Sequence, residues 1–127
     1  MEGAILDSNT AIYLLNGTLN AISSKAIADI ADKPFVLSVI GRIELLGWEA
    51  SNEEEALKVV LFVRAAVVLP LNEPVIERTI AIRRKYKIKL PDAIIAATAL
   101  EYNLKLITRN VADFDSIEGL TVVNPFG

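Results

Sequence analysis

Short, continuously apolar segments alternate along the chain with longer segments in which apolar residues recur every three or four positions. Short apolar runs bounded by turn residues are typical of strands buried on both faces, whereas the longer spacing is typical of helices. The pattern therefore predicts five strands, over residues 4–6, 35–38, 67–69, 105–108 and 121–123.

Helices are predicted between these strands, and turn or capping residues mark several of their ends. Asn16-Gly17 stops the first helix, Ser51 followed by Glu54 has the capping-box pattern, and Asn103 is a candidate C-cap. The predicted helices run from the first strand to about residue 15, and then over 21–31, 39–48, 51–64, 72–86 and 91–102, with a short helical turn before the last strand.

The alternation of strands and helices predicts the fold class. Strands separated by helices form a parallel sheet, and right-handed crossovers cover both of its faces. We therefore expect a three-layer α/β/α domain with a central five-stranded parallel sheet. No repeat or Gly/Ser linker divides residues 1–127, which predicts a single domain. Ligands of such folds bind at the carboxyl ends of the strands, near the switch in strand order.

Composition limits where the protein works. No stretch approaches the roughly 18–20 uninterrupted apolar residues of a membrane helix, and the start MEGAILDSN lacks the positive region of a secretory signal. The chain contains no cysteine, which excludes disulfides and thiolate chemistry. We expect a cytoplasmic protein with no membrane association.

The absence of histidine limits the chemistry further. It excludes Ser-His-Asp triads, histidine-based ribonuclease mechanisms and most catalytic zinc sites. Carboxylates remain, and these select oxygen-preferring ions such as Mg²⁺ and Mn²⁺. The net charge of −3 gives no global basic signature, so any contact with nucleic acid must be local.

Four acidic residues interrupt apolar segments: Asp7 in AILDSN, Glu44 in VIGRIELLGW, Asp92 in LPDAIIAATAL and Asp113 in LITRNVADF. A carboxylate in a buried segment is costly unless a cation or a hydrogen-bond donor compensates it. Two carboxylates about 5 Å apart at an effective dielectric of ~20 repel by roughly 3 kcal/mol. If the four converge, they need a divalent cation or bound protons, which predicts a metal site.

The first two acids also have purely structural interpretations. Asp7 ends a strand before a helix, where it can serve as the N-cap unless Ser8 or Asn9 takes that place. Glu44 lies on a short apolar helix and can pair with a cation such as Arg42.

The same holds for the other two acids. Asp92 falls in the first turn of its helix, where the helix dipole favours an acid. Asp113 can be an ordinary turn residue, with the amide of Asn110 nearby. Four alanines favour close packing of the Asp92 helix, which would push Asp92 toward a crevice; they are Ala93, Ala96, Ala97 and Ala99.

Four runs of sequence resemble the motif blocks of a known family. LDSN, SVIGRIEL, LPDAIIAATAL and TRNVADF, in this order across essentially the whole chain, are similar to the blocks of PIN-domain ribonucleases. The likeness is greatest to VapC-type toxins of type II toxin–antitoxin pairs. The resemblance implies that the catalytic residues and Mg²⁺ or Mn²⁺ ligands, direct or through water, are Asp7, Glu44, Asp92 and Asp113. It implies supporting roles for Ser8, Asn9, Thr108 and Asn110, and some relatives carry the fourth acid at the position of Asn110.

The resemblance also implies an activity and partners. A PIN-type endoribonuclease hydrolyses RNA phosphodiesters with metal-activated water and leaves a 5′-phosphate and a 3′-hydroxyl. A VapC-type toxin is held inactive by a cognate antitoxin protein, and relatives of this type usually form homodimers. Leu45, Leu46 and Trp48 are either core residues or part of a groove that takes an antitoxin helix.

A basic run precedes Asp92. Residues 83–89 hold five of the chain's 13 positive charges with Tyr86 among them. Such a run can follow an RNA backbone through Lys87 and Lys89, or it can be a solvated helix end that complements the helix dipole. Arg109, beside the predicted site, is a separate candidate for a phosphate contact.

Other functions fit the pattern less well. A housekeeping PIN-type RNA-processing nuclease needs the same acids, and an inactive binding module of PIN ancestry would not need all four. Residues 6–10, LDSNT, faintly match the Asp-x-Asp-x-Thr motif of haloacid-dehalogenase-like phosphatases, but Asn9 stands where the general acid belongs. A response-regulator receiver domain needs an Asp at the end of the third strand, where this chain has Leu69-Pro70.

Overall fold

Five parallel strands form one sheet in the computed structural model of the chain, which describes residues 3–15 and 35–125. The strand order is β3-β2-β1-β4-β5, so β1 lies at the centre. The strands are β1 (Ala4–Leu6), β2 (Val36–Ser38), β3 (Val67–Leu69), β4 (Lys105–Ile107) and β5 (Val122–Val123). The predicted strands are confirmed to within one residue at each end. The predicted helix over 21–31 and its preceding stop at Asn16-Gly17 lie outside the described residues.

Two hydrophobic cores lie on opposite faces of this sheet. Successive side chains of a strand point to opposite faces, and β1 follows the rule: Ile5 joins one core, whereas Ala4 and Leu6 join the other. The neighbouring strand β4 follows the same alternation, with Leu106 beside Ile5 and Ile107 beside Leu6. Because both faces of the central strand β1 are covered, its three residues are all buried and form an uninterrupted apolar run in the sequence.

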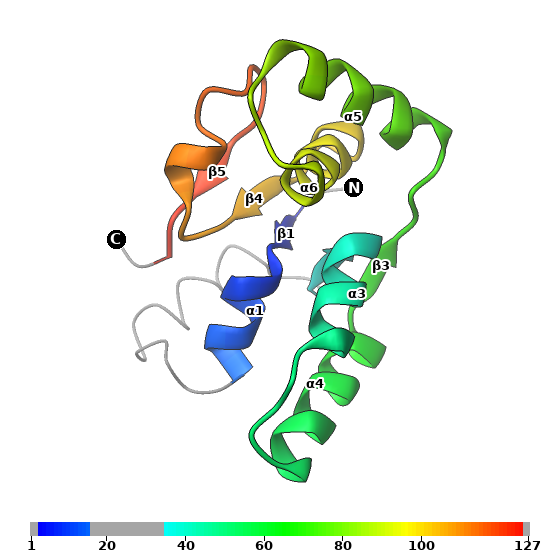
Figure 1. The fold of residues 1–127 in the computed structure, drawn as a ribbon, viewed down its shortest axis with the longest axis vertical. Helices are drawn as coiled ribbons and strands as arrows, with labels where there is room; N and C mark the ends of the chain where they lie inside the picture. Colours follow the sequence, from blue (N-terminus) through cyan, green and yellow to red (C-terminus); the bar gives the residue numbers. More distant parts are fainter. Residues whose placement is uncertain (1–2, 16–34, 126–127) are drawn as a thin grey trace.

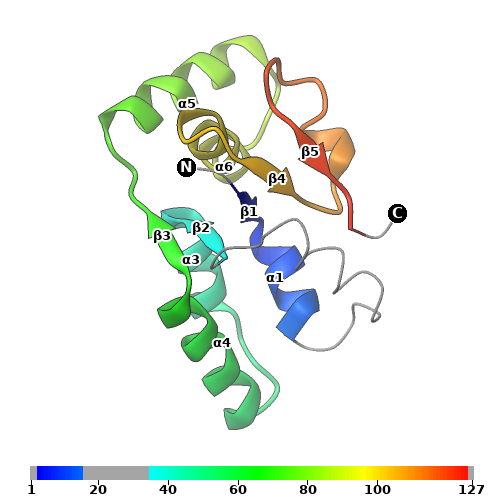
Figure 2. The same cartoon turned by 180° about the vertical axis from the view of Figure 1, so that it is seen from behind.

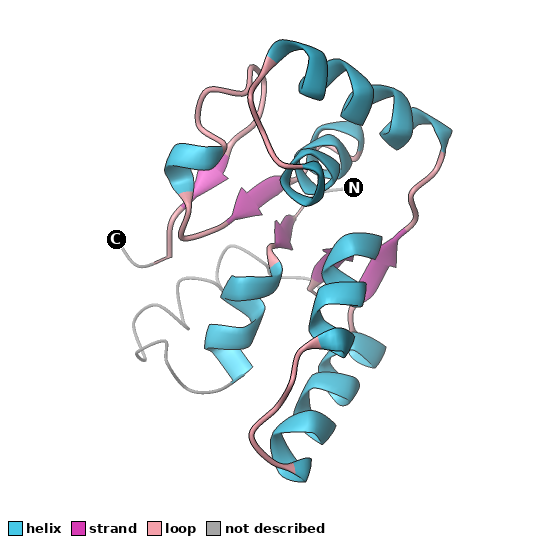
Figure 3. Cartoon of the chain, in the orientation of Figure 1, coloured by secondary structure: helices cyan, strands magenta, loops and turns pink. Residues whose placement is uncertain are grey.

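Helices form the two outer layers (Figures 1 and 3). The core of Ala4 and Leu6 is completed by α1 (Ser8–Leu15), α3 (Val39–Gly47) and α4 (Glu53–Ala65). The core of Ile5 is completed by α5 (Glu73–Lys85) and α6 (Leu90–Glu101). The predicted three-layer α/β/α architecture is confirmed.

Helix α6 lies between α5 and the sheet, as Figures 1 and 2 show from opposite sides. Its seven consecutive residues 93–99 are all buried, so the helix is apolar all round rather than along one stripe. The four alanines among them let neighbouring elements approach closely, as the sequence predicted. Asp92 therefore lies at the start of an otherwise buried helix.

Helix α4 begins one residue later than the capping-box pattern predicted. Asn52, not Ser51, is the N-cap, and its side chain accepts a hydrogen bond from the backbone N–H of Glu55 at 2.8 Å. The Glu55 carboxylate in turn accepts from the backbone N–H of Ser51 at 3.3 Å. Asparagine caps helices as well as serine does, and this start places three glutamates in the first turn, where the helix dipole favours acids.

Helix α6 ends at Glu101, and its C-cap lies one residue before Asn103, which the sequence had suggested for that position. Tyr102 is the C-cap, and Asn103 follows it with a φ of 55°, in the left-handed region that asparagine tolerates. The N–H of Leu104 donates to the carbonyl of Ala99 at 2.8 Å, and that of Asn103 donates to Leu100 at 3.3 Å. This tight reversal leads the chain directly into β4, the strand that ends beside the candidate site.

Two further expectations concern the chain as a whole. Among the described helices, none combines the length and the apolar character needed to cross a bilayer. The assignment of residues 1–127 to a single domain stays a prediction.

Candidate active site

The order of the strands creates a crevice at the carboxyl ends of β1 and β4. From β1 the chain proceeds to β2 and β3 on one side of the sheet and then returns to β4 and β5 on the other. Asp7 and Thr108 follow the paired residues Leu6 and Ile107, and the Thr108 hydroxyl donates to Asp7 Oδ2 at 2.5 Å. The site thus begins where parallel α/β sheets bind their ligands.

Asp7 is also the N-cap of α1. Its Oδ1 accepts from the backbone N–H of Thr10 at 2.8 Å, and its carbonyl accepts from Ala11 at 3.1 Å. Neither Ser8 nor Asn9 takes the capping position, so the alternative cap considered from the sequence is wrong. The capping and site interpretations are compatible, because each carboxylate oxygen has two acceptor sites and uses one here. These bonds fix the orientation of the carboxylate.

Glu44 reaches the same region from α3. The hydroxyl of Ser8 donates to Glu44 Oε1 at 2.9 Å, which connects α1 with α3 across 36 positions of sequence. Within the described part of the chain, Glu44 forms no ion pair with Arg42. Helix α3 is positioned by its own cap, since the buried Ser38 Oγ accepts from the N–H of Gly41 at 3.0 Å.

Three of the four predicted acids line one small cavity, named here the acidic cavity. Its volume of about 60 Å³ exceeds the ~10–15 Å³ that one water molecule needs, so a partly hydrated ion fits. Its lining residues are Asp7, Ser8, Asn9, Ser38, Ile40, Gly41, Glu44, Pro91, Asp92, Ile95 and Asn110.

The fourth predicted acid, Asp113, lies in an adjoining groove, named here the lysine groove. The groove has a volume of about 420 Å³, and Asp92 lines both it and the acidic cavity. Asn110 lines the acidic cavity, whereas Asp113 does not. The residues lining the lysine groove are Tyr86, Lys87, Ile88, Lys89, Asp92, Ala112, Asp113 and Ser116.

All four acids nevertheless share one electrostatic environment. Burial raises the pKa of Asp92, and the negative charges of Asp113, Asp7 and Glu44 raise it further, whereas Lys89 lowers it. Like charges disfavour ionisation. Asp113 has the largest effect of the three neighbouring acids. The carboxylates that are far apart in sequence are therefore close enough in space to repel.

The flanking sequence overstated how deeply these acids are buried. Asp7 and Asp92 are half-buried, but Glu44 and Asp113 are exposed. Glu44 precedes Leu45, which is buried, and neighbouring residues of a helix point about 100° apart, so an apolar neighbour does not bury a side chain. On a helix, the face on which a side chain lies decides its burial, and an apolar neighbour in the sequence does not.

The donor set fits a hydrated hard cation. Within residues 3–15 and 35–125, no group of three or more Asp or Glu side chains is gathered tightly enough to hold a metal ion by itself. The acids of the site also take part in none of the ion pairs between described residues. Carboxylate, hydroxyl and amide oxygens around a cavity with room for water suit Mg²⁺ or Mn²⁺, since Mg²⁺ keeps several waters and takes one or two carboxylates.

The basic run before Asp92 divides into two parts. Lys85 belongs to the surface of α5, because its ammonium lies 3.3 Å from the Glu118 carboxylate and 5.5 Å from the centre of the Tyr86 ring. Lys87 and Lys89 follow the helix and line the lysine groove. Only this second part faces the candidate site.

Arg109 lies next to Thr108 and is exposed. Its guanidinium lies 5.7 Å from the centre of the Tyr13 ring, a cation–π arrangement that ties it to α1. The side chain is thus held at the carboxyl end of β4, beside the acidic cavity.

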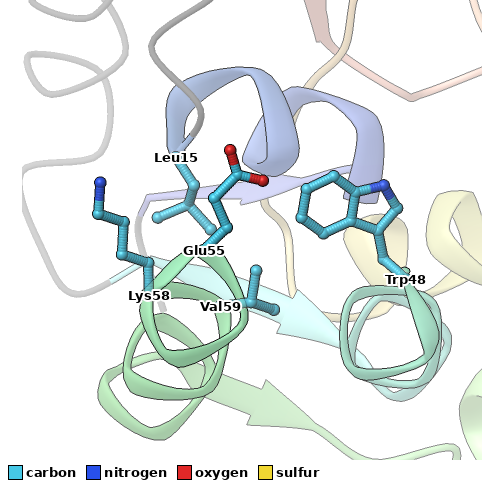
Figure 4. A pocket seen from close by; sticks show the side chains of 5 residues that line it. All are labelled: Leu15, Trp48, Glu55, Lys58 and Val59. Atoms are coloured by element: carbon cyan, nitrogen blue, oxygen red, sulfur yellow. The ribbon is translucent and has the colours of Figure 1, made fainter. Parts of the chain in front are cut away.

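The apolar residues at the end of α3 have different roles. Leu45 is core, and Trp48 packs partly against the same core, where it faces Leu15 across a small pocket (Figure 4). That pocket has a volume of only about 10 Å³, too small for a ligand. Leu46 is 47% exposed and lines a separate groove between α3 and α4.

Sequence reasoning missed several residues that shape the acidic cavity. Ser38 and Gly41 lie within the SVIGRIEL block but received no role, although Ser38 ends β2 much as Asp7 follows β1. A polar residue at the end of a predicted central strand was the available signal. Pro91 and Ile95 form the wall on the α6 side, and nothing in their types points to a site.

Comparison with known proteins identifies the family. The model of the PIN domain family matches residues 4–120. The chain belongs to the PIN-domain family. The resemblance to VapC-type proteins that the motif blocks indicated is also confirmed, because similar proteins include VapC and VapBC proteins.

Three relatives are similar over nearly their whole length. Ribonuclease VapC1 of Rickettsia felis is 29% identical over 131 residues, which cover 95% of this chain and 95% of that protein. A chain of the toxin–antitoxin complex from Klebsiella pneumoniae is 32% identical, with a TM-score of 0.78 and coverage of 97% and 98%. A chain of VapBC-1 from nontypeable Haemophilus influenzae is 26% identical, with a TM-score of 0.79 and complete coverage of both chains.

Proposed function

We propose that the chain is a Mg²⁺- or Mn²⁺-dependent endoribonuclease and the toxin of a toxin–antitoxin pair. The observation that carries the proposal is the acidic cavity: Asp7, Glu44 and Asp92 come from three different parts of the fold and line one space at the switch in strand order. The family membership and the VapC-type relatives support the same activity. The single-domain organisation predicted from the sequence is part of this proposal.

The acids divide into two groups in this proposal. Asp7, Glu44 and Asp92, which line the acidic cavity, would hold the cation, and Asp113, which lines the lysine groove with Asp92, would add negative charge beside it. The cation, when bound, supplies Lewis-acid stabilisation of the phosphodiester and lowers the pKa of water.

The supporting residues fix the acids in place. Thr108 donates to Asp7, and Ser8 donates to Glu44, so both carboxylates are oriented before a ligand enters. Asn9 and Asn110 line the cavity with amide groups that can orient a water or a phosphate oxygen. Arg109 contributes a positive charge for the phosphate backbone of RNA.

Cleavage of RNA tests the proposal directly. The protein should cleave RNA in the presence of Mg²⁺ or Mn²⁺, and EDTA should stop the reaction. Asp7→Asn and Asp92→Asn should each lower kcat/KM by about a hundredfold or more, because losing several kcal/mol of charge stabilisation has that effect. Asparagine still caps a helix, so Asp7→Asn removes the charge of Asp7 without removing its capping acceptor.

Asp115→Asn is the matched control. Asp115 is exposed, follows the same helical turn as Asp113 and lines neither cavity, so the activity of this variant should equal that of the wild type. Wild-type activity in Asp92→Asn, or cleavage that survives complete removal of divalent ions, would overturn the proposal.

The alternative functions have less support. A housekeeping PIN-type nuclease would use the same acids, but the similar solved structures include toxin–antitoxin complexes. A haloacid-dehalogenase-like phosphatase would need a general acid at Asn9 and would leave Glu44 in the cavity without a role.

An apolar groove supports an antitoxin as partner. It lies between α3, α4 and β3, with a volume of about 450 Å³, and its residues are Arg42, Leu46, Val60, Val63, Arg64 and Val68. A lining of apolar side chains and two arginines suits an amphipathic helix that carries acids on its polar side. Solved structures with this fold contain VapBC complexes, which supports an antitoxin as the occupant.

The homodimer expected from the resemblance is also part of the proposal. Ile80 and Leu90 are 43% and 50% exposed, and neither lines the groove between α3 and α4. These side chains lie outside the antitoxin groove and are available for contacts with a second copy of the chain. Light scattering on the purified protein should give twice the 13.8 kDa mass of one chain, and a monomeric mass at micromolar concentration would contradict it.

A further inference from the structure

The lysine groove is large enough for a ligand of its own and adjoins the candidate active site at Asp92. Its volume of about 420 Å³ lies in the range of ~300–1,000 Å³ of small-molecule sites, whereas the acidic cavity measures about 60 Å³. Asp92 forms part of the wall of both spaces. A ligand in the groove therefore lies directly beside any group held in the acidic cavity.

The groove carries charges of both signs, with the ammonium groups of Lys87 and Lys89 beside the carboxylates of Asp92 and Asp113. Lys87 and Lys89 line it, and neither forms an ion pair with any described residue. The nearby Lys85, in contrast, is engaged with Glu118. Two ammonium groups on residues two positions apart, both outside the ion pairs of the described chain, can approach a phosphate together.

The rest of the groove offers other chemistry. Ile88 and Ala112 add apolar surface, and Tyr86 adds an aromatic ring whose hydroxyl accepts from the N–H of Glu118 at 3.0 Å. Ser116 adds a hydroxyl that can donate or accept. Phosphate-binding lysines beside apolar, aromatic and hydroxyl groups match the parts of a nucleotide.

We propose that the lysine groove is a nucleotide subsite, which binds the nucleotide next to the phosphodiester that the acidic cavity acts on. Lys87 and Lys89 contact its phosphate, and the side chains of Tyr86, Ile88 and Ser116 are available to its base and sugar. This assignment rests on the proposed ribonuclease function. The proposed subsite gives a role to the part of the basic run that follows α5, because Lys87 and Lys89 line the groove.

Paired double variants test the subsite. Lys87→Ala with Lys89→Ala removes two charges from the groove, and Arg83→Ala with Arg84→Ala removes two charges from the exposed end of α5, outside the groove. The substrate is a pool of single-stranded RNA decamers of random sequence. Cleavage is assayed with Mg²⁺ at neutral pH, and thermal melting checks that both double variants are folded.

The lysine variant should raise KM about tenfold or more, and the arginine variant should change it by less than about threefold. The slope of the salt dependence of binding should fall by about 0.7 for each phosphate that the lysine variant no longer neutralises. If the wild type cleaves the pool and both variants have the same KM, the subsite is overturned while the ribonuclease function stands. If the wild type neither binds nor cleaves the pool, both proposals are overturned.

Discussion

A single side chain can serve the fold and the candidate site at once. Asp7 caps α1 with one carboxylate oxygen and accepts from Thr108 with the other. From the sequence these were competing interpretations, because an aspartate after a strand is a common cap. In the structure the two hydrogen bonds hold the carboxylate at the crevice, so the structural interpretation and the proposed functional one are compatible.

The relation between Asp92 and Asp113 predicts a measurable coupling. Asp113 is the neighbouring acid that raises the pKa of Asp92 most. Asp113→Asn removes this negative charge, so the pKa of Asp92 should fall toward its ordinary value of 3.8. Carboxyl ¹³C NMR titration of Asp92 without divalent ions measures the shift. The control Asp115→Asn should leave the pKa of Asp92 unchanged, and an equal pKa in wild type and Asp113→Asn would show that the two acids are not coupled.

Helix α3 is the element that connects the two candidate binding surfaces. Glu44 faces the acidic cavity, whereas Arg42 and Leu46 line the groove between α3 and α4. Residues two positions apart on a helix point about 200° apart. Glu44 therefore lies on one side of α3, and Arg42 and Leu46 lie on the other. A partner in the groove therefore lies against the same helix that positions Glu44.

Antitoxin binding should depend on the apolar wall of this groove. Leu46→Asp places a charge among apolar side chains, and burying it against a partner is costly, so affinity for the cognate antitoxin should fall by about a hundredfold. Isothermal titration calorimetry with the purified antitoxin measures the change. Leu71→Asp, at a position that is 40% exposed and lies outside the groove, is the control. Equal affinities for both variants would place the antitoxin elsewhere.

At the scale of the whole molecule, repulsion among the acids of the candidate site lowers the free energy of unfolding at neutral pH. The pKa of Asp92 is raised in the folded protein. Its stabilising contribution is therefore fully present below the pKa of the unfolded state and is lost as pH rises through the folded pKa. At neutral pH the ionised acids repel, and a cation that binds only the folded state offsets this repulsion.

Divalent ions should therefore raise the melting temperature at neutral pH. At ten times its Kd, a cation adds about 1.4 kcal/mol, which corresponds to about 3–6 °C for a chain of this size. Differential scanning calorimetry with Mg²⁺ and with EDTA measures the increase. Asp92→Asn should melt no lower than the wild type in EDTA, and Mg²⁺ should raise its melting temperature much less. An equal increase in both proteins would place the cation outside the acidic cavity.

Much of the fold could be predicted from the sequence because its signals are local. The strands are short apolar runs, and Asn103 marks the end of α6 through a backbone conformation that few residues tolerate. The start of α4 was misplaced by one residue, because Ser51 and Asn52 are both good caps and only the fold selects between them. The four motif blocks also carried the family resemblance, in the right order.

The tertiary structure alone decided which acids face one space. The sequence determined that carboxylates were the available chemistry and that Asp7 follows a strand while Asp92 begins a buried helix. Whether Asn110 or Asp113 lines the acidic cavity, and whether Glu44 reaches it, depends on the path of the loop after β4 and on how α3 packs against the rest of the fold. These are distances between residues far apart in the chain, and they are fixed only when the strands pair and the helices pack on both sides of the sheet.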